Sequence, residues 1–190
     1  MWQDNFDNDN LNGFPANWIP SGNGNTSYVT KSNYYSSPHS LSVQGISGGN
    51  WEGLVHRVFD NKYKHYQFEF AYLYTGQGNV GNHHLHGAFQ IKSMPNWAYG
   101  YIRTFIVFST DMHIIGYPSG TVIGNYSVNK WVKITVDYQR LPHSVKIKYY
   151  INDKFVHEEE ANTVTGENSL KYVTFHSGDT RCLLDDISVR

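Results

Sequence analysis

The chain lacks the features that mark several classes of protein. It has a single cysteine, Cys182, so no internal disulfide can form, and its strand-like surroundings predict a buried thiol. No apolar run is long enough to cross a bilayer, and no signal peptide begins the sequence. No window repeats apolar residues at helical spacing over three turns, so we expect the chain to contain little helix.

Charge of either sign is also scarce. Charged residues make up 16% of the chain, the formal net charge is −1, and no basic cluster occurs. Clustered basic residues are what attract nucleic acids and anionic membranes. We therefore expect neither nucleic acid nor a membrane as a partner.

Aromatic and turn-forming residues are abundant instead. Aromatics account for 16% of the chain, with 15 tyrosines, and there are 17 glycines among 190 residues. Aromatic residues favour strands, and glycine favours the turns between them. A chain of this length can bury a substantial core in one unit. We predict that residues 1–190 form a single all-β domain.

The segment 130–159 shows the strand pattern most clearly. Apolar and polar residues alternate over positions 132–138 and again over 145–151, and Asn152-Asp153 then marks a tight turn into a third strand. These three antiparallel strands would share one apolar face, which needs a second layer to cover it. Since helices are not expected, the second layer is a sheet. The sequence thus predicts a two-sheet antiparallel β-sandwich of the jelly-roll type.

The middle of the chain carries further strands with informative faces. Alternation extends over residues 63–74, 87–93 and 98–109. In the second of these strands we expect Gln90 and Lys92 to point outward. In the third we expect Ile102, Ile106 and Phe108 to face the core, which leaves Arg103 on the outside.

A ligand surface is expected where these outward faces meet. If the strands are neighbours, polar and aromatic side chains form one exposed patch, and tryptophans from flanking loops border it. The expected ligand-binding residues are Trp51, Glu69, Gln90, Trp97, Tyr99, Tyr101 and Arg103. Sugars pack their C–H faces on aromatic rings and bond their hydroxyls to planar polar groups. The alternative is that Glu69 and Arg103 form only a cross-strand ion pair.

Short motifs at both ends of the chain resemble a known group of proteins. Asn5-Phe6-Asp7, the Ser-Leu-Ser-Val run of residues 40–43 and the Leu-Asp-Asp-Ile-Ser-Val run of residues 184–189 resemble jelly-roll carbohydrate-binding modules with concanavalin A-like or galactose-binding-like sandwiches. The resemblance covers the frame of the chain and not its middle. It implies a non-catalytic, extracellular module that binds a polysaccharide or oligosaccharide and forms part of a larger secreted protein.

The same resemblance implies a structural calcium ion. Its ligands would be Asp7 and Asp185, with Asp186 as a substitute, together with backbone carbonyls between Asn33 and Ser37. Two carboxylates from opposite ends of the chain would repel each other unless a cation lay between them. Oxygen ligands suit Ca²⁺, and the ion would hold both termini in place. The alternative is a solvated, turn-rich loop at the N-terminal end.

Besides a binding module, two functions stay open: a polysaccharide lyase and a structural or adhesive domain. A glycosidase is not expected, because no alternating pair of carboxylates occurs and residues 157–160 place their acidic groups on both faces. A polysaccharide lyase acting on a uronate-containing glycan needs a Tyr or His base and an Arg or Gln partner for the carboxylate, types that Tyr101, His86, Arg103 and Gln90 offer. We expect His86, however, in a solvated loop over residues 75–86. The third possibility is a structural or adhesive domain of a surface protein or viral fibre.

Overall fold

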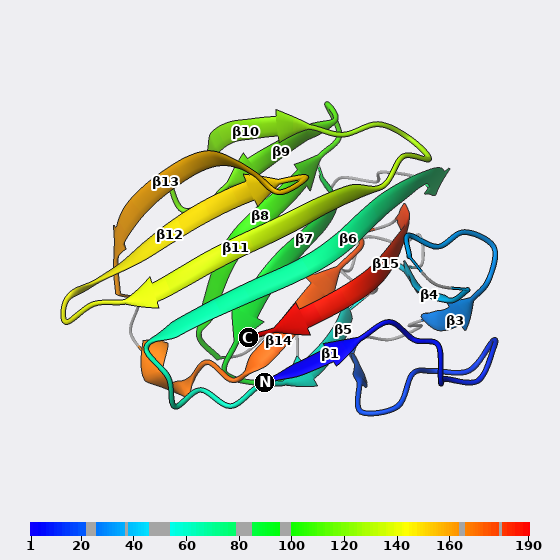
Figure 1. Ribbon diagram of the computed structural model, residues 1–190, viewed down its shortest axis with the longest axis horizontal. Coiled ribbons are helices and arrows are strands. Elements are labelled where there is room, and N and C mark those ends of the chain that lie inside the picture. The colour runs from blue at the N-terminus through cyan, green and yellow to red at the C-terminus, as the bar shows by residue number, and fades with distance from the viewer. Residues whose placement is uncertain are drawn as a thin grey trace.

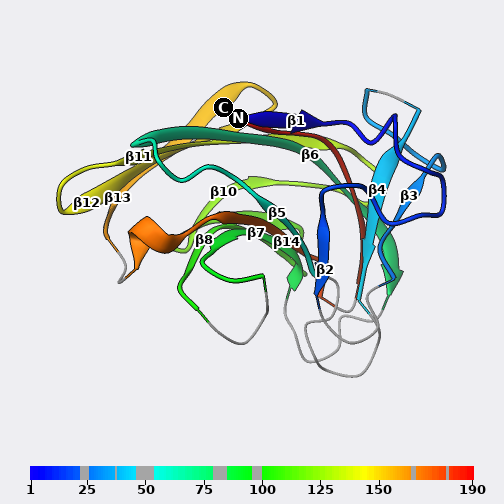
Figure 2. The same ribbon diagram turned by 90° about the horizontal axis from the view of Figure 1, so that it is seen from below.

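The alternating segments form two antiparallel sheets that lie face to face, as Figure 1 and Figure 2 show. The computed structural model describes residues 1–190 except 22–25, 37, 46–53, 79–84, 96–99, 164–165 and 179. Strands dominate the described part, whose helical structure is limited to one short 3₁₀ turn, and this confirms the all-β sandwich predicted from the sequence. It contains no helix that is long and apolar enough to span a membrane.

Sheet A is the larger layer and contains the C-terminal strand. In spatial order its strands are β13 (Lys154–Asn162), β12 (Ser144–Ile151), β11 (Val132–Arg140), β6 (His65–Gly78), β15 (Thr180–Val189), β4 (Ser40–Gln44) and β3 (Tyr28–Thr30). β1 (Trp2–Asp4) pairs with β15 outside this path.

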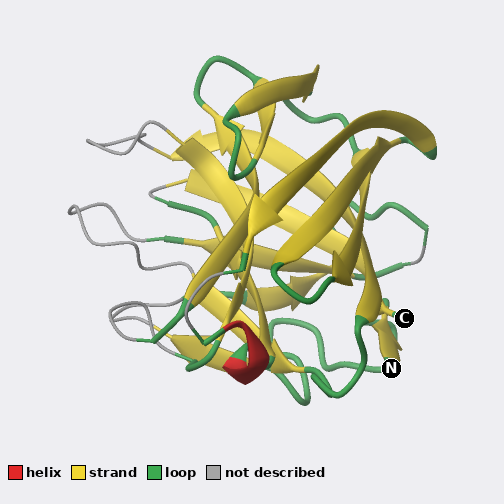
Figure 3. Ribbon diagram, turned by 90° about the vertical axis from the view of Figure 1, so that its left-hand side faces the viewer, coloured by secondary structure: helices red, strands yellow, loops and turns green. Residues whose placement is uncertain are grey.

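Sheet B packs against sheet A. Its strands run in the order β10 (Thr121–Asn125), β9 (His113–Gly116), β8 (Ile102–Ser109), β7 (Leu85–Lys92), β14 (Tyr172–His176), β5 (Leu54–Val58) and β2 (Ile19–Ser21). A short 3₁₀ turn, η1 (Glu167–Ser169), precedes β14 and is drawn in red at one end of the sandwich in Figure 3.

The three-strand meander predicted for residues 130–159 is present as β11, β12 and β13. β11 pairs with β12 and β12 with β13 in antiparallel register. The turn residues Asn152 and Asp153 have φ angles of 50° and 64°. Two consecutive positive φ angles give the turn whose twist matches that of a β-hairpin, and Asn and Asp tolerate them better than most residues.

The core between the sheets is rich in aromatic rings. Tyr72 of sheet A stacks on Phe108 of sheet B with ring centroids 3.6 Å apart, and the Phe70 and Phe89 centroids are 4.9 Å apart. Cys182 is buried in this core, as predicted, and burial raises the pKa of its thiol to about 12. Aromatic pairs across the layers therefore hold the two sheets together.

The first and last strands lie side by side. Trp2 is opposite Val189 and Asp4 is opposite Ile187 in antiparallel pairing. Figure 1 accordingly shows the two termini close together. This confirms the prediction, made from the motifs at the two ends, that both extremities meet on adjacent strands.

Candidate functional site

Strand alternation gives sheet B a polar outer face. The core-facing residues of β5, β7 and β14 are Val55, Phe89, Ile91, Val173 and Phe175. The positions between them therefore point away from sheet A. The outward residues of these strands include His56, Gln90, Lys92, Tyr172, Thr174 and His176. The outward direction of Gln90 and Lys92 was predicted from the sequence.

The strand register aligns four of the outward side chains. His56 is paired with Thr174, Thr174 with Gln90, and Gln90 with Thr104 of β8. We call these four residues the polar row. A His56 Nδ1–Thr174 Oγ1 hydrogen bond of 2.8 Å and a bond of 3.1 Å from Gln90 Nε2 to Thr104 Oγ1 join them in pairs. An imidazole, an amide and two hydroxyls are thus fixed side by side on rigid strands.

A buried lysine stands next to the polar row. Lys92 lies one pair along the strands, opposite Tyr172, and is only 2% exposed. Burial disfavours the charged ammonium and lowers the pKa of Lys92 to about 8. Its protonation state therefore changes close to neutral pH, unlike that of an ordinary surface lysine.

The imidazole of His56 is held in the neutral form. The pKa of His56 is lowered to about 3, mainly by burial and secondly by repulsion from the charge of Lys92. Its Nε2 atom is buried and has no hydrogen-bond partner in the described part of the chain. A cation and a neutral base in one buried cluster are costly for folding, and such clusters concentrate at functional sites.

The outer face is open at the Lys92 end. In the row that contains Lys92, Val58 of β5 is 50% exposed, Ile102 of β8 is 39% exposed and Tyr172 is half-buried. Tyr172 and its neighbours therefore give this end of the face an accessible aromatic and apolar surface beside the ammonium group.

The single patch predicted from the sequence does not form. Glu69 lies on the outer face of sheet A, where it pairs with Lys133 at 3.4 Å, whereas Gln90 lies on the outer face of sheet B. The two residues are on opposite sides of the sandwich because β6 and β7 belong to different sheets. The expectation that the three middle strands were neighbours is confirmed for β7 and β8, which pair in sheet B, and was wrong for β6.

The prediction that Arg103 is exposed was also wrong. Arg103 is buried and forms a two-point ion pair with Glu167, with distances of 2.7 Å from Nε and 2.6 Å from Nη2 to the carboxylate oxygens. A β-bulge shifts the register of β7 and β8 between Phe89 and Gln90, so Phe105 faces the core and Arg103 shares its side of the strand.

The remaining predicted ligand residues divide into two groups. Tyr101 is 45% exposed, and its ring lies against Gly166, the residue before η1. Trp51, Trp97 and Tyr99 lie outside the described residues. Their roles in binding stay predictions.

His86 belongs to the core and not to a solvated loop. It lies in β7, stacks on Tyr74 with centroids 3.8 Å apart, and its Nδ1 lies 2.6 Å from the hydroxyl of Tyr126. Burial lowers its pKa. A shift in register between Leu85 and Gly87 accompanies this inward direction. His86 therefore cannot serve as an accessible base.

The residues of the predicted calcium site lie where the two ends of the chain meet. The buried carboxylate of Asp185 accepts bonds from the backbone N–H groups of Tyr35 (2.9 Å), Ser36 (3.4 Å) and Asp186 (2.8 Å). Burial raises the Asp185 pKa to about 6. Asp7 accepts a bond from the side chain of Asn5.

These contacts bear on whether a cation fits. Both oxygens of Asp185 already accept N–H donors, which accounts for the burial of this carboxylate without a metal. The described residues contain no cluster of three or more acidic, histidine or cysteine side chains that would hold a metal ion. Calcium bound by Asp7, Asp185 and Asp186 stays a prediction that rests on the resemblance.

Comparison with known proteins identifies the fold. No protein-family model and no curated protein matches the sequence. The structure belongs to the class of two-sheet sandwiches that lectins, carbohydrate-binding modules and polysaccharide lyases share. At sequence identities of 14% or less, the likeness to the solved structures that follow shows the fold alone.

Three solved structures illustrate this class. The alginate lyase Aly36B is 12% identical with a TM-score of 0.56, over 99% of this chain and 95% of the lyase. The CBM22-1 xylan-binding domain of Xyn10C from Paenibacillus barcinonensis is 14% identical with a TM-score of 0.52, over 100% and 92% of the two chains. The lectin UEA-II, solved with galactose, is 12% identical with a TM-score of 0.58, over 99% and 97%.

Proposed function

We propose that this protein binds a polysaccharide on the outer face of sheet B. The observation that carries the proposal is the buried Lys92 beside the neutral imidazole of His56, next to a row of amide and hydroxyl groups. Buried ionisable groups with shifted pKa values concentrate at functional sites. We infer that a ligand meets these groups.

The chemistry of the face suits sugars. The partly exposed amide of Gln90 and hydroxyl of Thr104 are partners for sugar hydroxyls, and the ring of Tyr172 offers a surface for C–H groups. Proteins of the same fold include a xylan-binding domain, a lectin solved with galactose and an alginate lyase, which supports a carbohydrate as the ligand.

The lysine favours a second candidate function on the same face, a polysaccharide lyase that acts on a uronate-containing glycan. In its neutral form the Lys92 amine would remove the proton next to the uronate carboxylate. The released electron pair would form a C=C bond as the glycosidic C–O bond breaks, and the leaving oxygen would take up a proton. Gln90 would donate to the carboxylate. An amine with a pKa of about 8 suits the role of base near neutral pH.

Other parts of the sequence-based hypothesis remain part of this proposal. We also propose, from the resemblance to carbohydrate-binding modules, that the domain acts outside the cell as part of a larger secreted protein. A calcium ion near Asp185 would serve stability and not binding, because Asp185 belongs to sheet A and the polar row belongs to sheet B.

Affinity electrophoresis in gels that contain neutral or uronate-rich polysaccharides tests binding and turnover together. We expect retardation of the protein by at least one polysaccharide. Gln90→Ala should weaken retention about 3- to 10-fold, the usual effect of one lost hydrogen bond. The matched control is Gln139→Ala, which changes an exposed glutamine on the outer face of sheet A.

The outcomes separate the candidate functions. Retardation without unsaturated products supports a binding module, whereas the ultraviolet absorbance of an unsaturated uronate supports a lyase. Equal retention of Gln90→Ala and Gln139→Ala would contradict the assignment of the face. Inertness toward every polysaccharide would leave a structural or adhesive domain.

A further inference from the structure

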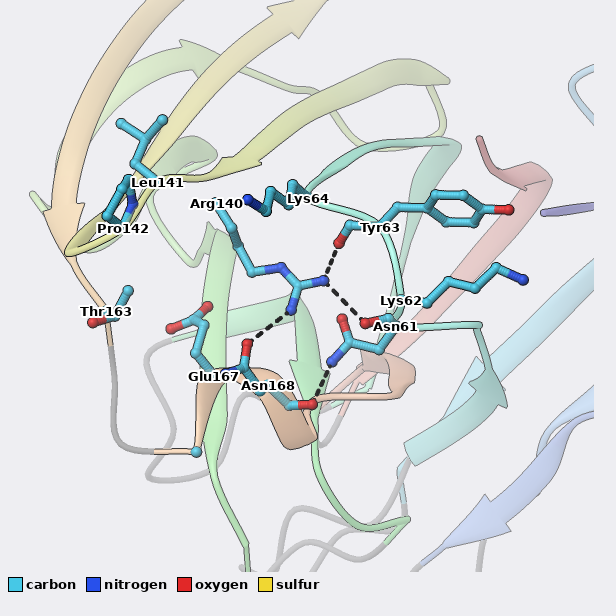
Figure 4. Close-up of a pocket in the computed structure, with 11 residues that line it drawn as sticks. Asn61, Lys62, Tyr63, Lys64, Arg140, Leu141, Pro142, Thr163, Glu167 and Asn168 are labelled. Atoms are coloured by element: carbon cyan, nitrogen blue, oxygen red, sulfur yellow. Dashed lines mark hydrogen bonds between the residues drawn. The ribbon is translucent and has the colours of Figure 1, made fainter.

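A polar cavity lies at one end of the sandwich, separate from the polar row of sheet B. It has a volume of about 690 Å³ and is formed by the loop before β6, the turn between β11 and β12, and the segment around η1. Figure 4 shows the residues that line it, among them Asn61, Tyr63, Lys64, Arg140, Glu167 and Asn168. This volume falls in the range that holds small ligands, about 300–1,000 Å³.

Arg140 is fixed in this cavity but keeps its charge. Its Nη2 atom donates to the backbone carbonyl of Asn61 at 3.1 Å and to that of Tyr63, and Nη1 donates to the side-chain oxygen of Asn168 at 3.2 Å (Figure 4). All three acceptors are neutral. The guanidinium is therefore oriented by the protein while its positive charge is left uncompensated.

The carboxylate in the lining does not cancel this charge. Glu167 is buried, and its oxygens accept bonds from Arg103 at 2.7 and 2.6 Å and from the hydroxyl of Tyr138. Arg103 thus neutralises Glu167 within the core. An anion that entered the cavity would not meet an uncompensated negative charge from this residue.

Lys64 adds a second positive charge. Its side chain is exposed, and no carboxylate in the described part of the chain lies within ion-pair distance of Lys64 or Arg140. Lys62, in contrast, is paired with Asp60 at 2.6 Å. The cavity therefore carries the two uncompensated charges of Lys64 and Arg140, in a geometry that favours an anion.

The walls specify the kind of anion. Leu141 and Pro142 form an apolar side of the cavity, and Thr163 and Asn168 add a hydroxyl and an amide, whereas the ring of Tyr63 points away from Arg140 (Figure 4). An apolar wall with amide and hydroxyl groups suits a sugar ring, whereas a bare phosphate or sulfate would use only the charges.

We propose that this cavity is a second glycan site, specific for a sugar residue that carries a carboxylate. The carboxylate would lie toward Lys64 and Arg140, and the ring would pack against Leu141 and Pro142. This site is separate from the polar row of sheet B, so it does not depend on the function proposed for that face.

Calorimetric titration with tri-galacturonate and with its methyl ester, which has the same size but no charge, tests this site. Gln90→Ala serves as the background, so that binding to the polar row is weakened. In that background Lys64→Gln should reduce the affinity for tri-galacturonate about 3- to 10-fold, and added salt should weaken binding. The control is Lys154→Gln, the same charge change on the edge strand β13.

Amide chemical shifts locate the bound sugar. Tri-galacturonate should shift the backbone signals of Asn61, Lys64 and Asn168 in the Gln90→Ala protein. Equal binding of the methyl ester, or equal affinities of Lys64→Gln and Lys154→Gln, would overturn the proposal. If tri-galacturonate shifts only the signals of residues near Gln90, such as Tyr172, in the unmodified protein, binding to the outer face of sheet B is supported and the cavity site is refuted. The two hypotheses can therefore fail separately.

Discussion

At the scale of single residues, Lys92 is the proposed binding residue whose burial lowers the stability of the fold. An ammonium group buried on a sheet face costs free energy, since burial lowers its pKa from 10.5 to about 8. We propose that Lys92 serves a ligand or a reaction, because buried ionisable groups with shifted pKa values concentrate at functional sites.

We predict that Lys92→Met stabilises the fold by about 1–3 kcal/mol at pH 7 while it weakens retention on uronate-rich polysaccharides and abolishes any turnover. Because the folded-state pKa is depressed, the unfolded state binds more protons between pH 8 and 10.5, so the stability of the wild-type protein rises over that interval. The gain from Lys92→Met should therefore be largest below pH 8 and decline toward pH 10.5. Urea unfolding across this pH range measures it, and a destabilised variant at pH 7 would contradict the prediction.

The sequence predicted the direction of this side chain but not its surroundings. Alternation within β7 is enough to place Gln90 and Lys92 outward. The partners of the polar row come from positions 56 and 174, on strands far away in the chain. Only the register of sheet B brings those strands together, and that register is not encoded in any local pattern.

At the scale of elements, the contact between β8 and η1 shows where local patterns fail. Regular alternation holds through β11 and β12, and their faces were predicted correctly. In β8 one bulge changes which residues face the core, so Arg103 moves from the predicted surface to a buried ion pair with Glu167. A bulge is set by the partner strand, which a single strand's sequence does not reveal.

We predict that Arg103→Met destabilises the protein by about 3–5 kcal/mol, because it leaves the Glu167 carboxylate buried without its cation. The double variant Arg103→Met/Glu167→Leu should recover part of this loss, since it removes the uncompensated charge as well. Urea unfolding of both variants measures the difference. A single variant within about 1 kcal/mol of the wild-type protein would show that the pair is not needed to hold η1.

At the scale of the whole molecule, the pairing of β1 with β15 was predictable because motifs at both ends indicated it. The arrangement of the middle strands was not, since assigning β6 and β7 to different sheets requires knowing which long-range pairs form. The ligand surface therefore had to be corrected while the frame of the fold did not.

The calcium hypothesis belongs to this scale, because the ion would join the two ends of the chain. If calcium binds near Asp185, chelation should lower the melting temperature by several degrees, at about 2–4 °C for each kcal/mol lost. Added Ca²⁺ should restore it, and Asp185→Asn should remove the response. A melting curve that is indifferent to both chelator and Ca²⁺ would refute the site and leave Asp185 as a carboxylate stabilised by backbone N–H groups alone.

The adjacency of the two termini has a consequence for presentation. Both ends leave the molecule beside sheet A, on the side opposite the outer surface of sheet B, as Figure 2 shows. Any carrier fused to either end, or to both at once, would sit behind the domain and leave the opposite side facing the medium. The same geometry would allow the domain to be inserted into a loop of a host protein through two short linkers.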